Sequence, residues 1–257
     1  MQTDSEVFKQ GPFRVRATYA RDRASRLLAT IQSGGMEVVE ALKDNPSNFV
    51  ARIRFEDDEL VVKIPHARNR RRYERFLTWF RPGDAFRRYR SMEQLAQLGF
   101  RGSEPVLAAE RRVCGMVVYN LLVYRYAHGQ PAGPGHERLL VEELTRFYRH
   151  GRTRRDAKPS NFLIVDGRPF FIDFRLDQPV LFGKLRVYQE FHQFFRRMPQ
   201  ARACFDDSGY RGAWFSLAGG LGAVWDGFNQ WRKAVRAAIK RRAGRRSGPA
   251  GNRPANP

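Results

Sequence analysis

The stretch from Arg154 to Arg175 reads Arg-Arg-Asp-Ala-Lys-Pro-Ser-Asn-Phe-Leu-Ile-Val-Asp-Gly-Arg-Pro-Phe-Phe-Ile-Asp-Phe-Arg. Asp156 and Asn161 frame its first loop, and a later apolar run ends on Asp173 in an Ile-Asp-Phe triplet. Sites of phosphoryl transfer space a base and two metal ligands in this way. The stretch therefore predicts phosphoryl-transfer chemistry and a fold able to support it.

The residues between the two metal-ligand candidates predict a short hairpin. Strands are expected at 162–165 and 169–172, joined by a turn at Asp166-Gly167. Because the strands of a hairpin run back alongside each other, Asn161 and Asp173 should lie at the same end. The two side chains are candidate ligands of Mg²⁺.

Transfer of a phosphoryl group from ATP depends on positioning and on neutralising charge. Asp156, in a loop just after a predicted helix, is the candidate base for an acceptor hydroxyl, and Lys158 is placed to contact the transferring phosphate. Taken singly, each Asp or Asn of this set is the kind of residue that commonly caps a turn. The prediction depends on their order along the chain.

A lysine upstream completes the candidate site. Lys63 lies in the apolar strand 60–64, which follows strand 49–55 after an acidic turn, and it would bind the α- and β-phosphates of ATP. Its acidic partner is expected to be Glu93, on the predicted helix 85–98. Glu74, on the preceding helix 67–81, remains a competitor.

The order of elements predicts two α+β lobes. Residues 1–126 contain most of the predicted strands, among them the apolar run 113–126, and form a sheet-rich N-lobe. Residues 127–246 are mainly helical, with helices expected at 137–150, 184–197 and 213–246. The Pro- and Gly-rich segment 130–135 is the candidate hinge. Residues 247–257 lack apolar anchors and are expected to be disordered.

The charge of the chain narrows the class of partner. A formal charge of +21 implies a polyanion: nucleic acid, an anionic membrane or a phosphorylated substrate. No nucleic-acid-binding motif accompanies the charge, and the aromatic residues near the arginines at 68–72 are spaced like core residues, so nucleic acid is disfavoured. The two cysteines lack metal-ligand spacing and are expected to be buried free thiols.

The C-terminal part of the chain has the pattern of a basic amphipathic helix. Apolar residues recur at helical spacing between Leu221 and Ile239, and Arg and Lys gather at 232–246. Such a helix either lies on an anionic inner-membrane surface or docks on the protein core. No signal peptide or run of about 18 apolar residues is present, so a cytoplasmic chain is expected, with peripheral membrane attachment left open.

These residues also resemble known families. The segment 156–161 resembles the catalytic loop of the protein-kinase-like superfamily, and 173–175 resembles its Asp-Phe-Gly motif. More narrowly, the chain is similar to the lipopolysaccharide core heptose kinases of Gram-negative bacteria over roughly residues 45 to 180. The further segments that carry this resemblance are Val62-Lys63-Ile64, Tyr73-Glu74-Arg75-Phe76-Leu77, Gly83-Asp84 and Leu98-Gly99-Phe100.

The resemblance implies a protein-kinase-like fold and the phosphorylation of an inner-core heptose by ATP and Mg²⁺ at the cytoplasmic membrane. It makes Asp156 the base, Asn161 and Asp173 the metal ligands, and Lys63 the phosphate-binding lysine. No Ala-Pro-Glu segment for holding a peptide follows Asp173, which favours a small or glycan acceptor.

The chain departs from the kinase pattern at three places. Arg154 stands where protein kinases usually have His, Arg175 replaces the Gly of Asp-Phe-Gly, and the turn 43–48 is not glycine-rich. Two alternatives therefore remain: another small-molecule or protein kinase of the superfamily, and an inactive scaffold that binds anionic surfaces.

Overall fold

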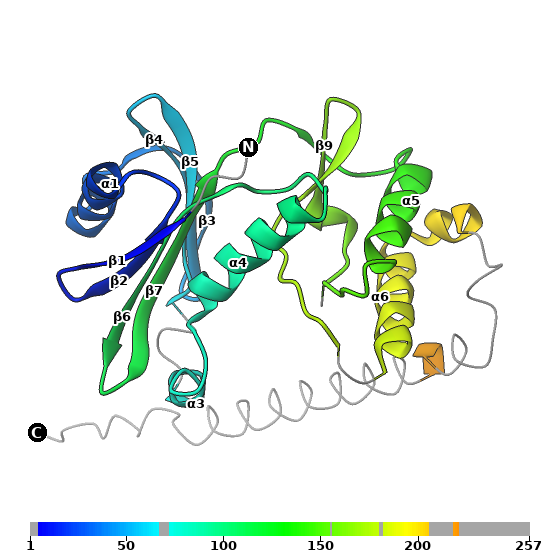
Figure 1. The fold of residues 1–257 in the computed structure, drawn as a ribbon. Helices are drawn as coiled ribbons and strands as arrows, with labels where there is room; N and C mark the ends of the chain where they lie inside the picture. The colour runs from blue at the N-terminus through cyan, green and yellow to red at the C-terminus, as the bar shows by residue number, and fades with distance from the viewer. Residues whose placement is uncertain (1–4, 67–71, 155, 180–181, 206–217, 221–257) are drawn as a thin grey trace, which may run out of the picture.

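The computed structural model describes residues 5–66, 72–154, 156–179, 182–205 and 218–220. Figure 1 shows a large twisted sheet on one side and a smaller, mainly helical part on the other, with helix α4 between them. Two clusters of buried apolar residues correspond to these parts. The candidate site lies where the two parts meet.

The large sheet has seven strands in the order β1-β2-β6-β7-β5-β4-β3, and every neighbouring pair is antiparallel. Strands β6 and β7, in the middle of the sheet, are buried on both faces over part of their length, whereas β3 at the edge is largely exposed. The strands are β1 (Glu6–Gln10), β2 (Phe13–Ala17), β3 (Glu37–Asn45), β4 (Asn48–Phe55), β5 (Asp58–Ile64), β6 (Pro105–Val113) and β7 (Met116–Arg125).

A helix covers each face of this sheet (Figure 1). Helix α1 (Arg21–Ser33) buries Leu27, Leu28 and Ile31 against one face. Helix α4 (Asp84–Gln97) buries a stripe at helical spacing that includes Phe86 and Tyr89, and this stripe joins the core of the helical part. Helix α4 therefore packs against both parts of the molecule.

The helical part is built around buried phenylalanines, among them Phe147, Phe162, Phe171 and Phe191. Their packing fixes the hairpin that carries the metal-ligand candidates against the helices. The elements here are β8 (Gln130–Pro131), α5 (Glu137–Tyr148), η1 (Pro159–Asn161), β9 (Phe162–Val165), β10 (Arg168–Phe171), α6 (Gly183–Arg197) and η2 (Pro199–Cys204), while the short α3 (Arg72–Leu77) lies beside the large sheet.

Several sequence-based boundaries were wrong. The apolar run 113–126 is not one strand, because Cys114 and Gly115 both have positive φ and form the tight turn between β6 and β7. Cys114 is consequently exposed rather than buried. Strand β1 and helix α1 were not predicted. Within the described residues, the helix expected at 67–81 spans only α3, and the helix expected at 85–98 begins one residue earlier, at Asp84, with Gly83 as its N-cap.

The aromatic residues of α3 and the turn after it were expected in the core, but four of them are exposed. They are Tyr73, Phe76, Trp79 and Phe80. The segment is nevertheless anchored, since the indole of Trp79 donates to the carbonyl of Cys114 at 2.7 Å and the backbone N–H of Val117 donates to Thr78 Oγ1 at 2.7 Å.

Two predictions for the C-terminus lie outside the described residues: the disordered tail 247–257, and all of the predicted helix 213–246 except 218–220. Within the described part of the chain, no helix is long and apolar enough to cross a bilayer. Strand β7 ends at Arg125, one residue before the boundary expected between the N-lobe and the C-lobe at Tyr126. That boundary stays a prediction.

Candidate active site

A cavity of about 440 Å³ lies between the strands β3, β4, β5 and β7, helix α4, and the residues that directly precede and follow the hairpin β9–β10. Its volume falls within the range of roughly 300–1,000 Å³ that is typical of small-molecule sites. The lining of the cavity contains both apolar and charged side chains. The lining residues are Leu42, Lys43, Asn48, Val50, Lys63, Pro65, Asp84, Arg88, Tyr124, Ser160, Asn161, Ile172 and Asp173.

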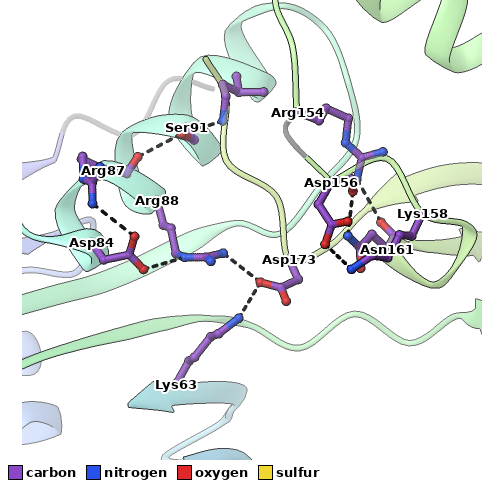
Figure 2. Close-up of polar contacts among 11 residues, drawn as sticks. Lys63, Asp84, Arg87, Arg88, Ser91, Arg154, Asp156, Lys158, Asn161 and Asp173 are labelled. Atoms are coloured by element: carbon purple, nitrogen blue, oxygen red, sulfur yellow. Dashed lines mark hydrogen bonds and ion pairs between the residues drawn. The ribbon is translucent and has the colours of Figure 1, made fainter. Parts of the chain in front are cut away.

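Asp173 holds two cations at this cavity (Figure 2). Its Oδ1 accepts from Lys63 Nζ at 2.5 Å and from Arg88 Nη1 at 2.8 Å. Arg88 also donates from Nε to Asp84 Oδ2 at 2.9 Å. The result is a row of alternating charges, from Lys63 through Asp173 and Arg88 to Asp84.

The row changes the acidity of its members. Burial alone would raise the pKa of Asp173, but the charges of Lys63 and Arg88 and their hydrogen bonds outweigh it and lower that pKa to about 2. Burial and the neighbouring charge of Arg88 lower the pKa of Lys63, against the opposing effect of Asp173. The carboxylate is therefore ionised at neutral pH and available to a metal ion.

Backbone structure brings the members of the row together from distant parts of the sequence. Lys63 pairs with Val50 on β4 and Leu122 on β7, so it lies at the centre of the sheet. Asp173 follows β10 and has a φ of 46°. Phe174, the next residue, is buried in the core, which fixes the carboxylate at the cavity.

Asp156 is held on both sides by side chains. Lys158 Nζ contacts one carboxylate oxygen, and Gln193 Nε2, on α6, donates to the other at 3.2 Å. The amide of Asn161 donates to the backbone carbonyl of Asp156 at 2.9 Å. The candidate base is thus oriented by its own loop and by helix α6.

Arg154, in place of the histidine of protein kinases, is a buried residue that supports this loop. Its guanidinium lies 4.3 Å from the ring centre of Phe162 and 4.6 Å from that of Phe171. Its backbone N–H donates to both carboxylate oxygens of Glu190, at 3.0 and 2.9 Å. Burial lowers the pKa of Arg154 to about 10. The loop is therefore well packed with Arg154 at the position where protein kinases have histidine.

The structure brings together most of the residues that the sequence singled out. Lys63, Asn161 and Asp173 line one cavity. Asp156 and Lys158 lie in the loop beside it, on the same side as Asn161 (Figure 2). Their chemical roles stay predictions.

The expected pairing of Glu93 with Lys63 is wrong. Glu93 binds Arg16 at 2.8 Å and accepts from Ser5 at 2.7 Å. Nine residues separate it from Asp84, which is about two and a half helical turns, so the two side chains leave opposite sides of α4. The competitor Glu74 lies near Arg81, at 3.4 Å.

Sequence reasoning missed four residues of the site. Asp84 and Arg88 are four positions apart on a helix and face the cavity together, a spacing that could have identified them. Glu190 and Gln193 on α6 hold the loop that carries Asp156, but only the folded chain shows that this helix lies against it.

The oxygen atoms at the cavity suit Mg²⁺. Magnesium binds through one or two protein carboxylates together with phosphates and water. Asp173 supplies an ionised carboxylate, and Asn161 uses its amide nitrogen to donate to Asp156, which leaves its side-chain oxygen as an acceptor. Among the described residues no cluster of three His, Cys, Asp or Glu could hold a metal.

Comparison with known proteins adds evidence on the fold. The solved structure of WaaP in complex with acyl carrier protein matches over 81% of this chain and 92% of that chain, with a TM-score of 0.51 and 16% identity. The chain has a two-lobed, kinase-like fold. The fold prediction is thereby confirmed.

The other comparisons provide less evidence on the fold. The PknI kinase domain of M. tuberculosis matches over 69% of this chain and 77% of that chain, with a TM-score of 0.40 and 17% identity. No protein-family model and no curated protein matches the sequence.

Proposed function

We propose that this chain transfers the γ-phosphoryl group of ATP to a sugar hydroxyl, and that the acceptor is a heptose of the lipopolysaccharide inner core. The observation that carries the proposal is the convergence of Lys63, Asn161 and Asp173 on one cavity, with Asp156 in the adjoining loop. The fold shared with WaaP and the resemblance of residues 45 to 180 to heptose kinases support it.

The nucleotide would lie with its base among apolar residues and its phosphates among charged ones. Leu42 and Val50 on the sheet, and Ile172 before Asp173, line the apolar part of the cavity. Lys63 would bind the phosphates. Asn161 and Asp173 would hold Mg²⁺, which when bound neutralises phosphate charge in the transition state.

Asp156 would orient the acceptor hydroxyl and take its proton. As the hydroxyl oxygen forms a bond to the γ-phosphorus, the bond from that phosphorus to the β–γ bridging oxygen breaks, and its electron pair leaves with ADP. Gln193 and Lys158 hold the carboxylate of Asp156 in position. Lys158 would also contact the transferring phosphoryl group.

The acceptor is proposed to be a glycan because the chain has little room for a peptide-binding segment. Helix α6 begins at Gly183, so only residues 174–182 separate it from Asp173. Protein kinases use a longer segment ending in Ala-Pro-Glu to hold a peptide, and no such sequence follows Asp173.

We further propose that the chain works on the cytoplasmic side of the inner membrane, in contact with anionic lipid. Residues 72–81 expose aromatic side chains and carry three arginines against one glutamate. Aromatic and basic residues together are typical of proteins that bind anionic bilayers. Phe80 is 79% exposed and Tyr73 is 71% exposed, so both are available to lipid.

The proposal is tested by incubating the full chain with γ-labelled ATP, Mg²⁺ and dephosphorylated core oligosaccharide. Wild-type protein should transfer label to the glycan, and Asp156→Asn should bind ATP but transfer none. An inactive scaffold would give no transfer with either protein and no Mg²⁺-dependent thermal shift with ATP. Transfer to protein and not to glycan would favour the protein-kinase alternative.

A further inference from the structure

In chain order, the turn between β3 and β4 comes where a kinase has its glycine-rich loop, one strand before the strand that carries the lysine, yet its backbone amides are already bonded. Ser47 N–H donates to Asn45 Oδ1 at 3.0 Å and Asn48 N–H donates to the same oxygen at 2.9 Å. Pro46 has no N–H. None of the residues 46–48 therefore has an amide free to bind phosphate.

Strand β3 places a lysine at the cavity by means of a β-bulge. The pairing of β3 with β4 shifts between Ala41 and Lys43, which leaves Leu42 as the extra residue. Successive residues of a regular strand point to opposite faces, but a bulge re-aims one of them. Leu42 and Lys43 accordingly both line the cavity.

Lys43 belongs to a row of residues that crosses three strands. It pairs with Val50 on β4, and Val50 pairs with Lys63 on β5. Directly paired residues lie on the same face of a sheet, so both lysines face the cavity. Among the described residues, none makes a hydrogen bond or ion pair with the side-chain ammonium of Lys43.

Arg88 supplies the third cation from the opposite wall. It lines the cavity and is fixed by Asp84 and Asp173. In the kinase pattern an acidic residue of this helix pairs with the lysine of the sheet. Here the residue of α4 that reaches the carboxylate bound by Lys63 is a cation, Arg88, whose guanidinium is held between Asp173 and Asp84 at the cavity wall.

We propose that Lys43 and Arg88, together with Lys63, form a phosphate cradle that replaces the amides of a glycine-rich loop. The proposal rests on the proposed function, because it takes the ligand to be a nucleoside triphosphate. Three side-chain cations suit a polyphosphate, whose charge is spread over several oxygens. Recognition then depends on side-chain charge instead of on loop conformation.

The test measures binding, not turnover, by calorimetry on the full chain in the absence of Mg²⁺. The ligands are ATP and adenosine, which share the base and ribose and differ in the phosphates. Lys43→Ala should weaken ATP binding by about tenfold, as expected for the loss of one charge-assisted contact, and leave adenosine binding unchanged. Lys9→Ala, which removes the same charge from exposed β1, is the matched control and should change neither.

Arg88 needs a second pair of variants because its removal leaves Asp84 and Asp173 without their shared partner. Arg88→Lys should retain ATP binding to within a few-fold, and Arg88→Gln should weaken it by about tenfold while adenosine still binds. Retained adenosine binding shows that the cavity is folded.

The outcomes separate this inference from the proposed function. If wild-type protein binds ATP and Lys43→Ala matches Lys9→Ala, the cradle is wrong and the proposed function stands. If wild-type protein binds neither ATP nor adenosine, both are overturned. An equal loss of ATP and adenosine binding in Lys43→Ala would also contradict the cradle, because the lysine would then support the cavity as a whole.

Discussion

Lys63 Nζ lies 2.5 Å from Asp173 Oδ1, although 110 positions separate the two residues in the sequence. One comes from the centre of the large sheet and the other from the hairpin of the helical part, so this contact joins the two parts of the molecule at the cavity. It puts the phosphate-binding candidate and a metal-ligand candidate within reach of one nucleotide.

The charge row around Asp173 predicts a stability change in acid. The pKa of Asp173 in the folded chain is about 2, below the value of about 3.9 in an unfolded chain. Its contribution to stability is therefore complete above about pH 4 and is lost as the pH falls through about 2. In urea unfolding, the difference between wild type and Asp173→Asn should shrink from pH 6 to pH 2.

The control for this experiment is Asp22→Asn, which removes an exposed carboxylate from α1. Its unfolding curve should follow the wild type across the same range. A difference between wild type and Asp173→Asn that stays constant down to pH 2 would show that Asp173 is not ionised preferentially in the folded state.

Gln193 should affect the chemical step and not nucleotide binding. It donates to the carboxylate of Asp156, and a hydrogen bond to a charged group contributes roughly 1.5–3 kcal/mol, so Gln193→Leu should lower kcat by about tenfold or more with KM for ATP unchanged. Gln97→Leu, an exposed glutamine on α4, is the control. A higher KM with normal kcat would argue against a role in orienting the base.

Arg154 should contribute to stability through its packing more than through its charge. Among the described residues, none forms a hydrogen bond with its buried Nε and Nη1, which is costly, while its guanidinium packs against the rings of Phe162 and Phe171. Arg154→Ala should lower the free energy of unfolding by roughly 2–4 kcal/mol. Arg154→Met keeps the side-chain volume. Its free energy of unfolding should lie within about 1 kcal/mol of the wild-type value or above it.

Urea unfolding of the two variants decides between these contributions. Equal destabilisation by Ala and Met would mean that the cation itself holds the loop. Retained ATP binding in Arg154→Met would further indicate that this departure from the kinase pattern is compatible with an intact site.

The membrane proposal predicts that the exposed aromatics of residues 72–81 bind anionic vesicles. Replacing both Tyr73 and Phe80 by Ser should reduce co-sedimentation with vesicles containing phosphatidylglycerol, and raising the salt concentration should reduce binding of the wild type. Val7→Ser removes an exposed apolar side chain from β1 and should have no effect. Unchanged binding by the double variant would exclude this surface.

Local sequence patterns were enough to predict the hairpin strands, α4 to α6 and the convergence of Lys63, Asn161 and Asp173. These patterns failed where contacts between distant parts of the chain determine the position of an element or a side chain. Helix α1 was missed because its sequence is mostly polar, and only a narrow stripe of it is buried. Glu93 was chosen for its place on the right helix, but helical phase directs it away from Lys63. Gln193 is recognisable only once α6 lies against the loop.

The most direct test of the phosphotransferase proposal is mass spectrometry of the lipopolysaccharide core from cells that carry wild-type protein, Asp156→Asn or no copy of the chain. The proposal predicts a phosphorylated heptose with wild-type protein and its loss in both other cases. The same phosphorylation of the core in all three would contradict it.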